Sequence, residues 1–582
     1  MNPHQLEMEE EVLGRWPRRL LHVPSMTSMP WTPGNRYGPF SEPAYNVITY
    51  TWGRWRLHDG ETPEVPALGV RGVPWKIPRV RPSAFTAAQL HKVVQHATRP
   101  HRQMENPIMR SDETEPVNFI WLDVACIDQR GDEPGSAAEI GRQALIFEHA
   151  RQVFVWLSTK PTSNLRPLLA EFESLHKVVN SVLSPRAIPL PDYMVVLKSI
   201  HKCFVALLSD PWFTSLWTLQ EAFLRPDAVL LSSEAEAIVI EDLGDYHFTL
   251  FNVLMCNDEY FRENMGPRSL PDIYFETRKL LSEAGLPSLS SLNALGAYIA
   301  AHSRKVGSDR DRIYGIQQIF RFRLGISSPT SPPGVNYSRA ELDIQFGSKL
   351  LETYPIFSQM HFFTVPAPVG QGWLVNPSSI TPPELHGNIT PNHAGLIPHY
   401  DNLCRLSTAQ LEEGNWGYFE GKTCPFSWLY EQCQGLERAR PNLFRDSTLL
   451  IVHPDATEEL GASPEQHEQK GQELSVRRPR QEQLCSWLAH QFPRRDNLVV
   501  LLLGSISHSD SDDSVDYEFN AVIALLLLPC QASNGFHYYR RVGFCWWNPG
   551  PHENNYEIKY TLPGMSQFLE QETWKRQSGY FG

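Results

Sequence analysis

Tyr45-Asn-Val-Ile-Thr-Tyr-Thr-Trp-Gly53 opens the part of the chain that decides its fold. The stretch up to Tyr50 is rich in β-branched and aromatic residues and contains no breaker, which predicts a buried strand. Thr51-Trp52-Gly53 then follows as a turn. The next elements are read outward from this strand and its turn.

Helical and extended patterns alternate after this first strand. A helical pattern runs from a cap at Ser83 to about Thr98, and a short apolar strand follows at Asn118–Asp123. Ile140 to Ala150 is amphipathic with helical spacing, and Val153–Leu157 is again an apolar strand. Strand, helix, strand, helix, strand is typical of βαβ units, so the sequence predicts an α/β domain with a mostly parallel sheet.

Proline-rich and polar stretches divide the rest of the chain, which holds 47 prolines in 582 residues against a usual share of about 5%. We expect more than one domain at this length. The predicted divisions are an irregular Pro-rich arm at 1–44, the α/β domain at 45–225, a helical extension at 226–340, a Pro-rich linker at 341–400, and a mixed, β-rich C-terminal region at 401–582 with a disordered insertion at 455–482.

Composition excludes several classes of protein. Hydrophobic residues make up 41% and charged residues 20%, an ordinary globular mixture, and the net charge of −13 argues against nucleic acid as a partner. Nine cysteines without a CxxC pair indicate reduced thiols and no zinc ribbon or other metal site. The N-terminus has no apolar signal region, and no apolar run approaches the ~20 residues of a membrane helix. We therefore expect a soluble, cytoplasmic protein with no membrane span.

Five segments resemble one known family in the right order. They are Tyr45–Gly53, Ile120-Trp-Leu-Asp-Val-Ala-Cys-Ile-Asp-Gln129, Glu139 to Leu157, Trp212-Phe-Thr-Ser-Leu-Trp-Thr-Leu-Gln-Glu221 and Asp309-Arg-Asp-Arg-Ile-Tyr-Gly315. Together they resemble the HET domain of fungal heterokaryon incompatibility proteins. One departure is Ser215, which stands where the family usually has Arg two residues before the Trp of its last motif. If that Arg binds a carboxylate or a phosphate, this chain has lost the contact.

The order of the same motifs is more distantly similar to TIR domains. That resemblance implies a flavodoxin-like sheet and places Glu221 on the Glu with which catalytic TIR domains cleave NAD. It therefore implies Glu221 as a catalytic residue and NAD as a substrate, with no certain cofactor.

The expected geometry places further residues beside Glu221. In an open parallel sheet, ligands bind beyond the carboxyl ends of the strands. We expect Glu221 to reach that edge from the start of its helix, and Trp52 to stack on a flat ring. The predicted ligand-binding residues are Tyr50, Trp52, Gly53, Asp123, Asp128 and Trp217.

Each of these residues also has a purely structural interpretation. The tryptophans are large apolar residues that usually fill cores. Gly53 can supply a turn, Asp123 and Asp128 can cap one, and Glu221 can sit near a helix N-terminus where a carboxylate is favoured. Cys126 is expected to be a buried, inert thiol.

Two hypotheses about function therefore stay open. The HET resemblance implies an effector of fungal heterokaryon incompatibility and programmed cell death, after non-self recognition, either by NAD glycohydrolase-like chemistry or as a non-enzymatic, self-associating signalling module. The expected partners are a second copy of the chain or another incompatibility protein. A pocket where Glu221, Asp123 and an aromatic residue converge favours the enzyme, and a strand edge filled by tryptophans favours the module.

Overall fold

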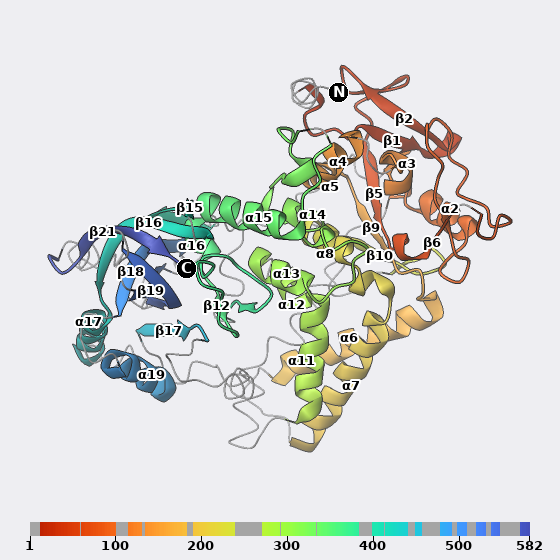
Figure 1. Cartoon of the computed structure of the whole chain (residues 1–582). Coiled ribbons are helices and arrows are strands. Elements are labelled where there is room, and N and C mark those ends of the chain that lie inside the picture. Colours follow the sequence, from red (N-terminus) through yellow and green to blue (C-terminus); the bar gives the residue numbers. More distant parts are fainter. Residues whose placement is uncertain are drawn as a thin grey trace. The chain divides into compact units, whose positions relative to one another are not determined.

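The chain folds as two compact units, Met1–Leu342 and Asp343–Gly582, and each is described by itself (Figure 1). The structure is a computed structural model. It describes residues 12–582 apart from 59, 101–114, 131–133, 183–189, 239–270, 291–292, 333, 383–397, 412–413, 440–448, 457–477, 492–497, 509–519, 531–536 and 548–570.

The first unit is built on a nine-stranded sheet whose strands lie in the order β11-β10-β9-β5-β8-β1-β2-β3-β4. The strands are β1 (Arg19–His22), β2 (Thr27–Thr32), β3 (Arg36–Tyr37), β4 (Phe40–Ser41), β5 (Tyr45–Thr49), β8 (Phe119–Trp121), β9 (Val153–Trp156), β10 (Val229–Leu231) and β11 (Ala237–Ile238). A separate small ladder pairs β6 (Arg56–Leu57) with β7 (Arg79–Val80).

Only the centre of this sheet is parallel. β5 pairs in parallel with β8 on one side and with β9 on the other, and β9 pairs in parallel with β10. β1 to β4 and β11 add antiparallel strands at the two sides. All residues of β5, β8, β9 and β10 are buried, as expected for strands covered on both faces. The predicted α/β class is confirmed, with a mixed sheet around a parallel centre.

The predicted Pro-rich arm is wrong, because residues 19–41 form the four antiparallel strands β1 to β4. Prolines at short intervals mark turns as readily as they mark irregular chain. Here the turns of short hairpins also use residues with positive φ, among them Asn35 at 55° and Gly38 at 61°. The prolines that we interpreted as a sign of irregular chain therefore lie in and between very short strands.

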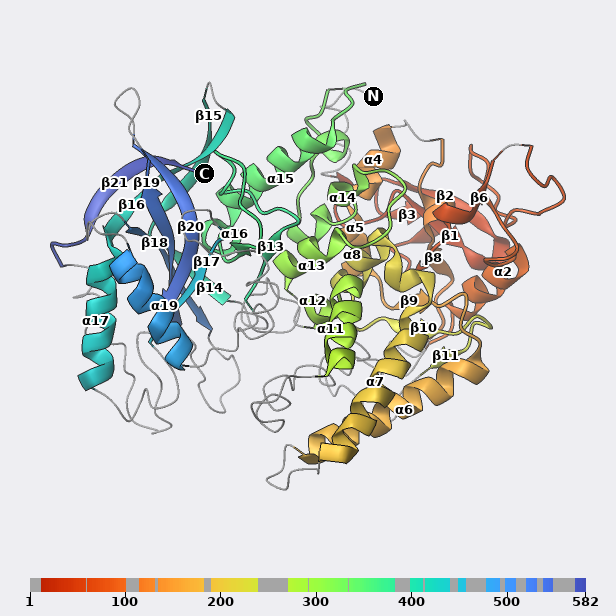
Figure 2. The same cartoon turned by 60° about the horizontal axis from the view of Figure 1, so that its bottom comes forward.

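Helices connect the parallel strands. They are α2 (Ala87–His96), α3 (Asp123–Cys126), α4 (Pro134–Ile140), α5 (Gln143–His149), α6 (Thr162–Val182), α7 (Leu190–Leu208) and α8 (Leu216–Leu224). α6 and α7 pack side by side as a long pair (Figures 1 and 2). α2 starts later than predicted. Thr86 caps it instead of Ser83, because Gln89 lies three residues after Thr86 and completes a capping box.

The rest of the first unit is helical beyond β11, among the residues described. Its helices are α11 (Asp272–Ala284), α12 (Leu286–Ser290), α13 (Ala294–Ala301) and α14 (Asp311–Tyr314). α8 packs against α12, α13 and α14. The predicted extension from 226 to 340 is therefore partly strand, since β10 and β11 belong to the sheet, and otherwise helical where it is described.

The second unit holds an eight-stranded sheet in the order β14-β18-β19-β20-β21-β16-β15, with β17 paired to β20. β16 also pairs with β18, so β16, β18, β19, β20 and β21 form a closed circuit, which protects strand edges. The strands are β14 (Pro398–Asn402), β15 (Arg405–Leu411), β16 (Gly414–Pro425), β17 (Leu450–Pro454), β18 (Val499–His508), β19 (Asn520–Pro529), β20 (Tyr538–Trp547) and β21 (Lys575–Phe581). This sheet lies in the region that the sequence predicts to be mixed and β-rich.

Two helices, α17 (Phe426–Ala439) and α19 (Arg478–Gln491), lie side by side over this sheet (Figure 2). Their apolar faces share one core with β18, β19 and β20, which includes Leu429, Leu488 and Val500.

The predicted linker at 341–400 is not an open linker. It contains most of α15 (Arg339–Thr353), then α16 (Pro355–Ser358), β12 (Phe362–Phe363) and β13 (Ser379–Ile380). Most of the predicted insertion at 455–482 lies outside the described residues, but α19 already begins at Arg478.

Candidate active site

The candidate site lies where the parallel strands of the first unit end. Because these strands run in parallel, their carboxyl ends meet at one edge of the sheet. The chain leaves β5 toward β8 and leaves β9 toward β10, so the connections diverge between β5 and β9. Ligands of open α/β sheets bind at such a divergence.

A chain of two hydrogen bonds holds Glu221 at the end of β5. The indole Nε1 of Trp212 donates to the Thr49 hydroxyl oxygen at 2.9 Å, and that hydroxyl donates to Oε2 of Glu221. Thr49 is the last residue of β5, so Glu221 lies directly at the strand end. Trp212 and Thr49 are buried, whereas Glu221 stays partly exposed.

Glu221 is the sixth residue of α8 and not near its start, which corrects our expectation. Ser215 is the N-cap residue, and the backbone carbonyl of Glu221 already accepts from the C-cap Arg225. The helix dipole therefore does not favour the carboxylate there. Burial, opposed by the Thr49 hydrogen bond and assisted by the charge of Asp123, raises the pKa of Glu221 to about 8.

Asp123 lies at the end of β8 and is held by two donors. The indole Nε1 of Trp52 donates to Oδ2 at 2.5 Å, and the backbone N–H of Val124 donates to Oδ1 at 2.7 Å. Burial raises the pKa of Asp123 above its ordinary value in spite of these hydrogen bonds. Asp123 is the first residue of α3, whose N-cap is Leu122, so it does not cap that helix, and its side chain anchors Trp52.

Tyr50 lies close to both carboxyl groups. Its hydroxyl is buried and has no well-aligned hydrogen-bond partner among the described residues, although it lies near enough to Asp123 to affect the pKa of that group. Burial, and then the charges of Asp123 and Glu221, raise the pKa of Tyr50 well above its ordinary value. The Tyr50 hydroxyl therefore interacts with Asp123 and belongs to the same group of side chains as the two carboxyl groups.

Three other predicted site residues have different surroundings. Asp128 forms an ion pair with Arg130 at 2.6 Å. Trp217 faces Asp311, since a hydrogen bond from Trp217 opposes the rise that burial causes in the pKa of Asp311. Gly53 is exposed in the 3₁₀ turn η2 (Gly53–Trp55). The structure thus brings together Glu221, Asp123, Tyr50 and Trp52, and it places Asp128 and Trp217 in separate contacts.

Cys126 has the surroundings of an inert thiol. It is buried beneath the end of β8, and burial raises its pKa to about 12. A thiol of this kind carries little thiolate at neutral pH, so it is a poor nucleophile.

Arg304 was not singled out by sequence, yet it fixes the start of α8. Its guanidinium is fully buried and donates to the carbonyl oxygen of Ser215 at 2.8 Å and to the hydroxyl of Thr218 at 3.2 Å. It also donates to the carbonyl oxygen of Ala284. Arg304 therefore holds the turn that contains Ser215 through its backbone, which no motif in the sequence indicates.

A buried glutamine network fixes α8 near Glu221. Nε2 of Gln220 donates to Oε1 of Gln143 at 2.7 Å, and Oε1 of Gln220 accepts from the backbone N–H of Gln318 at 3.0 Å. All three side chains are buried. α8 is thus tied to α5 on one side and to the helical extension on the other.

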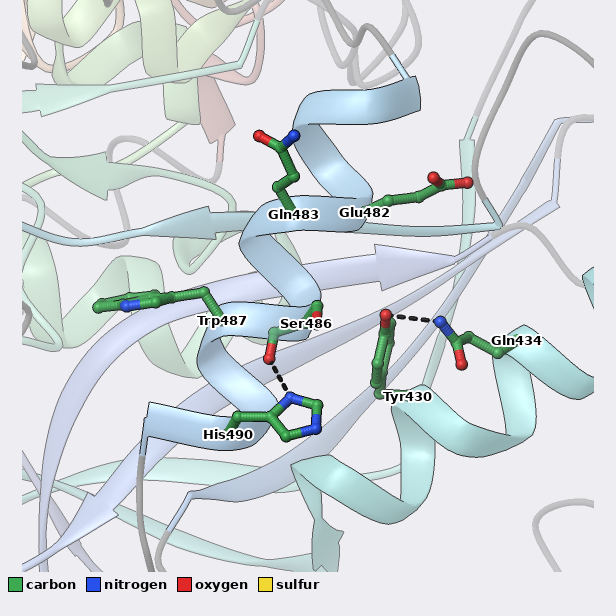
Figure 3. A pocket seen from close by; sticks show the side chains of 7 residues that line it. All are labelled: Tyr430, Gln434, Glu482, Gln483, Ser486, Trp487 and His490. Atoms are coloured by element: carbon green, nitrogen blue, oxygen red, sulfur yellow. Dashed lines mark hydrogen bonds between the residues drawn. The ribbon is translucent and has the colours of Figure 1, made fainter.

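The second unit contains a hollow whose lining differs from the candidate site of the first unit. It measures about 550 Å³ and lies between α17 and α19, where the seven side chains labelled in Figure 3 line it. Within it, Nε2 of Gln434 donates to the Tyr430 hydroxyl at 2.6 Å. Its lining mixes aromatic and polar groups without the paired carboxyl groups of the first unit.

Among the described residues, no group of three or more His, Cys, Asp or Glu side chains is arranged to hold a metal ion. No helix in the described part of the chain is long and apolar enough to cross a membrane.

The fold and its strand-end residues define an α/β domain with a pair of carboxyl groups at the edge of a central parallel sheet. Comparison with known families identifies this domain, because residues 45–221 match the family model described as Heterokaryon incompatibility protein (HET). Residues 45–221 are therefore the part of the chain that resembles a HET domain. No protein of curated function and no solved structure matches the chain.

Proposed function

We propose that the chain is an effector of fungal heterokaryon incompatibility that acts in the cytoplasm and causes cell death by cleaving NAD, with Glu221 as its catalytic residue. The observation that carries this proposal is the convergence of Glu221 and Asp123 at the strand ends, beside the buried hydroxyl of Tyr50. Perturbed carboxyl groups that stay accessible at such an edge are typical of functional sites.

The order of the parallel strands supports a likeness to flavodoxin-like folds. In chain order, the second, first, third and fourth parallel strands lie side by side as β8, β5, β9 and β10. Flavodoxin-like sheets have this order, with their ligand between the first and third strands. The resemblance to TIR domains, which implies the same fold and NAD cleavage, agrees with this arrangement.

The proposed reaction is hydrolysis of the bond between nicotinamide and ribose. Nicotinamide leaves as a neutral molecule with the electron pair of that bond, and the ribose carbon becomes cationic. Water adds to this carbon and releases a proton. An ionised Glu221 beside the ribose stabilises the developing positive charge, as carboxylates do in other glycosidic cleavages.

The protonation of Glu221 bears on substrate choice. With a pKa of about 8, its carboxyl group is mostly protonated at pH 7. The positively charged nicotinamide ring favours the ionised form of a neighbouring carboxyl group. NAD binding is therefore expected to release a proton, whereas the neutral product nicotinamide is not expected to do so.

Nicotinamide release by the purified full chain tests the proposal. The chain is incubated with NAD at high protein concentration, beside the Glu221→Gln variant at the same concentration. Release by the unaltered chain and its loss in the variant support a glycohydrolase. A folded, unaltered chain that leaves NAD intact contradicts it.

A second candidate function is the non-enzymatic, self-associating module. Trp52 favours it, because its indole is bonded to Asp123 and so covers one of the two carboxyl groups. In this case Glu221 is structural, and the Glu221→Gln variant kills cells as well as the unaltered chain at equal protein level. Sedimentation of both proteins then shows the same concentration-dependent association.

A further inference from the structure

Arg54, in the turn that follows β5, has a guanidinium group that makes only long, weak hydrogen bonds. Arg54 is exposed in η2, and its Nη1 reaches the hydroxyl of Thr214 at 3.3 Å while its Nη2 reaches the carbonyl oxygen of Pro211 at 3.5 Å. Both distances are longer than ordinary N–H···O hydrogen bonds. The guanidinium also lies 5.3 Å from the ring centroid of Trp55.

Arg54 forms no ion pair with a carboxylate within the described part of the chain. The charge that acts on it is that of Asp210, whose carboxylate is already used. Oδ2 of Asp210 accepts from the hydroxyl of Thr159 at 2.6 Å, and Oδ1 accepts from the backbone N–H of Trp212 at 2.9 Å. Most of the five donors of the guanidinium therefore remain available.

Lys160, which follows the end of β9, is a second cation on which the charge of Asp210 acts. Its ammonium group donates to the carbonyl oxygen of Ala206 and to the hydroxyl of Ser209, each at 2.5 Å. The charge of one buried carboxylate, that of Asp210, thus acts on two cations at this rim.

This rim adjoins the candidate active site through direct contacts. Arg54 touches the 3₁₀ turn η4 (Pro211–Thr214), and Trp212 of that turn donates to Thr49, which in turn holds Glu221. Two residues before Arg54, Trp52 is bonded to Asp123. The turn after β5 therefore contacts Asp123, which follows β8, and also η4, the turn before α8.

We infer that Arg54, with Lys160 near the same carboxylate, is an anion subsite that binds a phosphate group of the nucleotide substrate. This inference deepens the proposed function and rests on it. A guanidinium suits phosphate because its planar donors pair with two oxygens at once. The nicotinamide end then lies toward Glu221 and Asp123, and the phosphates lie over η4.

Calorimetry with the full chain tests the subsite without turnover. ADP-ribose and inorganic pyrophosphate are titrated into the unaltered chain, Arg54→Ala and Arg56→Ala. Arg56 is an exposed arginine two residues further along, so its removal makes the same change of charge. We expect Arg54→Ala to weaken binding of both ligands about ten- to hundredfold, and Arg56→Ala to leave it nearly unchanged.

Kinetics with two substrates separates binding of the phosphate from the chemical step. NAD and nicotinamide riboside contain the same glycosidic bond, but the riboside has no phosphate. Arg54→Ala is expected to raise KM for NAD with little change in kcat and to leave cleavage of the riboside unaltered. Arg54→Lys, which keeps the charge, recovers part of the loss.

The outcomes distinguish failure of the subsite from failure of the proposed function. If the unaltered chain cleaves neither substrate but Arg54→Ala loses ADP-ribose binding, the glycohydrolase proposal fails and the subsite stands. Absence of ADP-ribose and pyrophosphate binding, or equal binding by the Arg54→Ala and Arg56→Ala variants, overturns the subsite. Equal kinetic losses with NAD and the riboside overturn it as well.

Discussion

Each of the two units contains a cluster of ionisable side chains, but the charges of the two clusters are balanced in different ways. In the second unit, the fully buried Arg541 donates to the carbonyl oxygen of Gly372 at 3.0 Å and to Nε2 of His361 at 2.9 Å. Its Nε lies 3.5 Å from Oδ2 of Asp455, which is also buried. In the first unit, Glu221 and Asp123 have no cation within ion-pair distance among the described residues.

This difference separates a structural cluster from a functional one. A buried ion pair whose guanidinium also donates hydrogen bonds to neighbouring segments ties these segments together, and water has no access to it. Two partly exposed carboxyl groups, one of which, Asp123, makes ionisation of the other, Glu221, more costly, contribute little to the stability of the fold. Such arrangements are typical of functional sites. We therefore predict that changes at Arg541 and Asp455 act on stability and that changes at Glu221 and Asp123 act on function.

The largest expected effect on stability is that of Arg541→Met. The change leaves Asp455 buried without its counter-charge, and breaking a buried pair from one side typically costs about 3–5 kcal/mol. Urea unfolding of the second unit measures this loss. Arg576→Ala, which removes an exposed arginine of β21 in the same unit, should change the free energy of unfolding by less than about 0.5 kcal/mol. Equal effects of the two variants would contradict a structural role for the buried cluster.

Glu221→Gln should have the opposite effect, with a large loss of activity and a small change in stability. The amide keeps the size and the hydrogen bonding of the protonated acid, so we expect the free energy of unfolding to change by about 1 kcal/mol or less. Loss of one electrostatic group in a site typically lowers the rate about 10²–10³-fold, measured here as nicotinamide release. Glu283→Gln on the exposed face of α11 is the matched control and should keep full activity. A variant that retains activity removes Glu221 from the catalytic machinery.

Stability of the first unit should depend on pH through Glu221. Its pKa is raised to about 8 from an ordinary value of 4.5, so the folded state holds a proton that the unfolded state has lost. The stabilising contribution is complete below about pH 4.5 and is lost as pH rises through 8. The unfolding midpoint of the unaltered chain should therefore fall relative to that of Glu221→Gln between pH 5 and 8.5. A difference that stays constant over this range would show that Glu221 ionises as an ordinary surface acid.

Much of the first unit was predictable because its central strands carry a strong local signal. β5, β8 and β9 are short apolar runs between turn residues, and the helices that join them show regular apolar spacing. The hairpins of β1 to β4 were missed because strands of two to six residues contain too few positions to show alternation. α15 was missed because prolines lie on either side of it, and we interpreted the whole stretch around them as a linker.

The candidate site was predicted only in part, because its contacts join distant segments. Motif order indicated Glu221, Asp123, Tyr50 and Trp52, which the structure brings together. Thr49 was missed, since sequence alone does not tell which of two neighbouring strand residues faces α8. Arg304 was missed because its partner Ser215 lies 89 residues away and is contacted through its carbonyl oxygen, which any residue provides.

The smallest expected effect comes from Asp123→Asn, which tests whether the two carboxyl groups act on each other. The amide keeps the shape of the side chain and an acceptor for Trp52 or Val124, but it removes the charge that helps to raise the pKa of Glu221. The pH at which Glu221 ionises should therefore move toward acid. It is measured as the pH-dependent difference in stability between Asp123→Asn and the Asp123→Asn/Glu221→Gln double variant, which needs no activity. Asp128→Asn is the control, because Asp128 is paired with Arg130 and should leave the midpoint in place. If neither Asp123→Asn nor Asp128→Asn changes the pH at which Glu221 ionises, Asp123 and Glu221 are independent groups. The proposal that they form one paired site is then wrong.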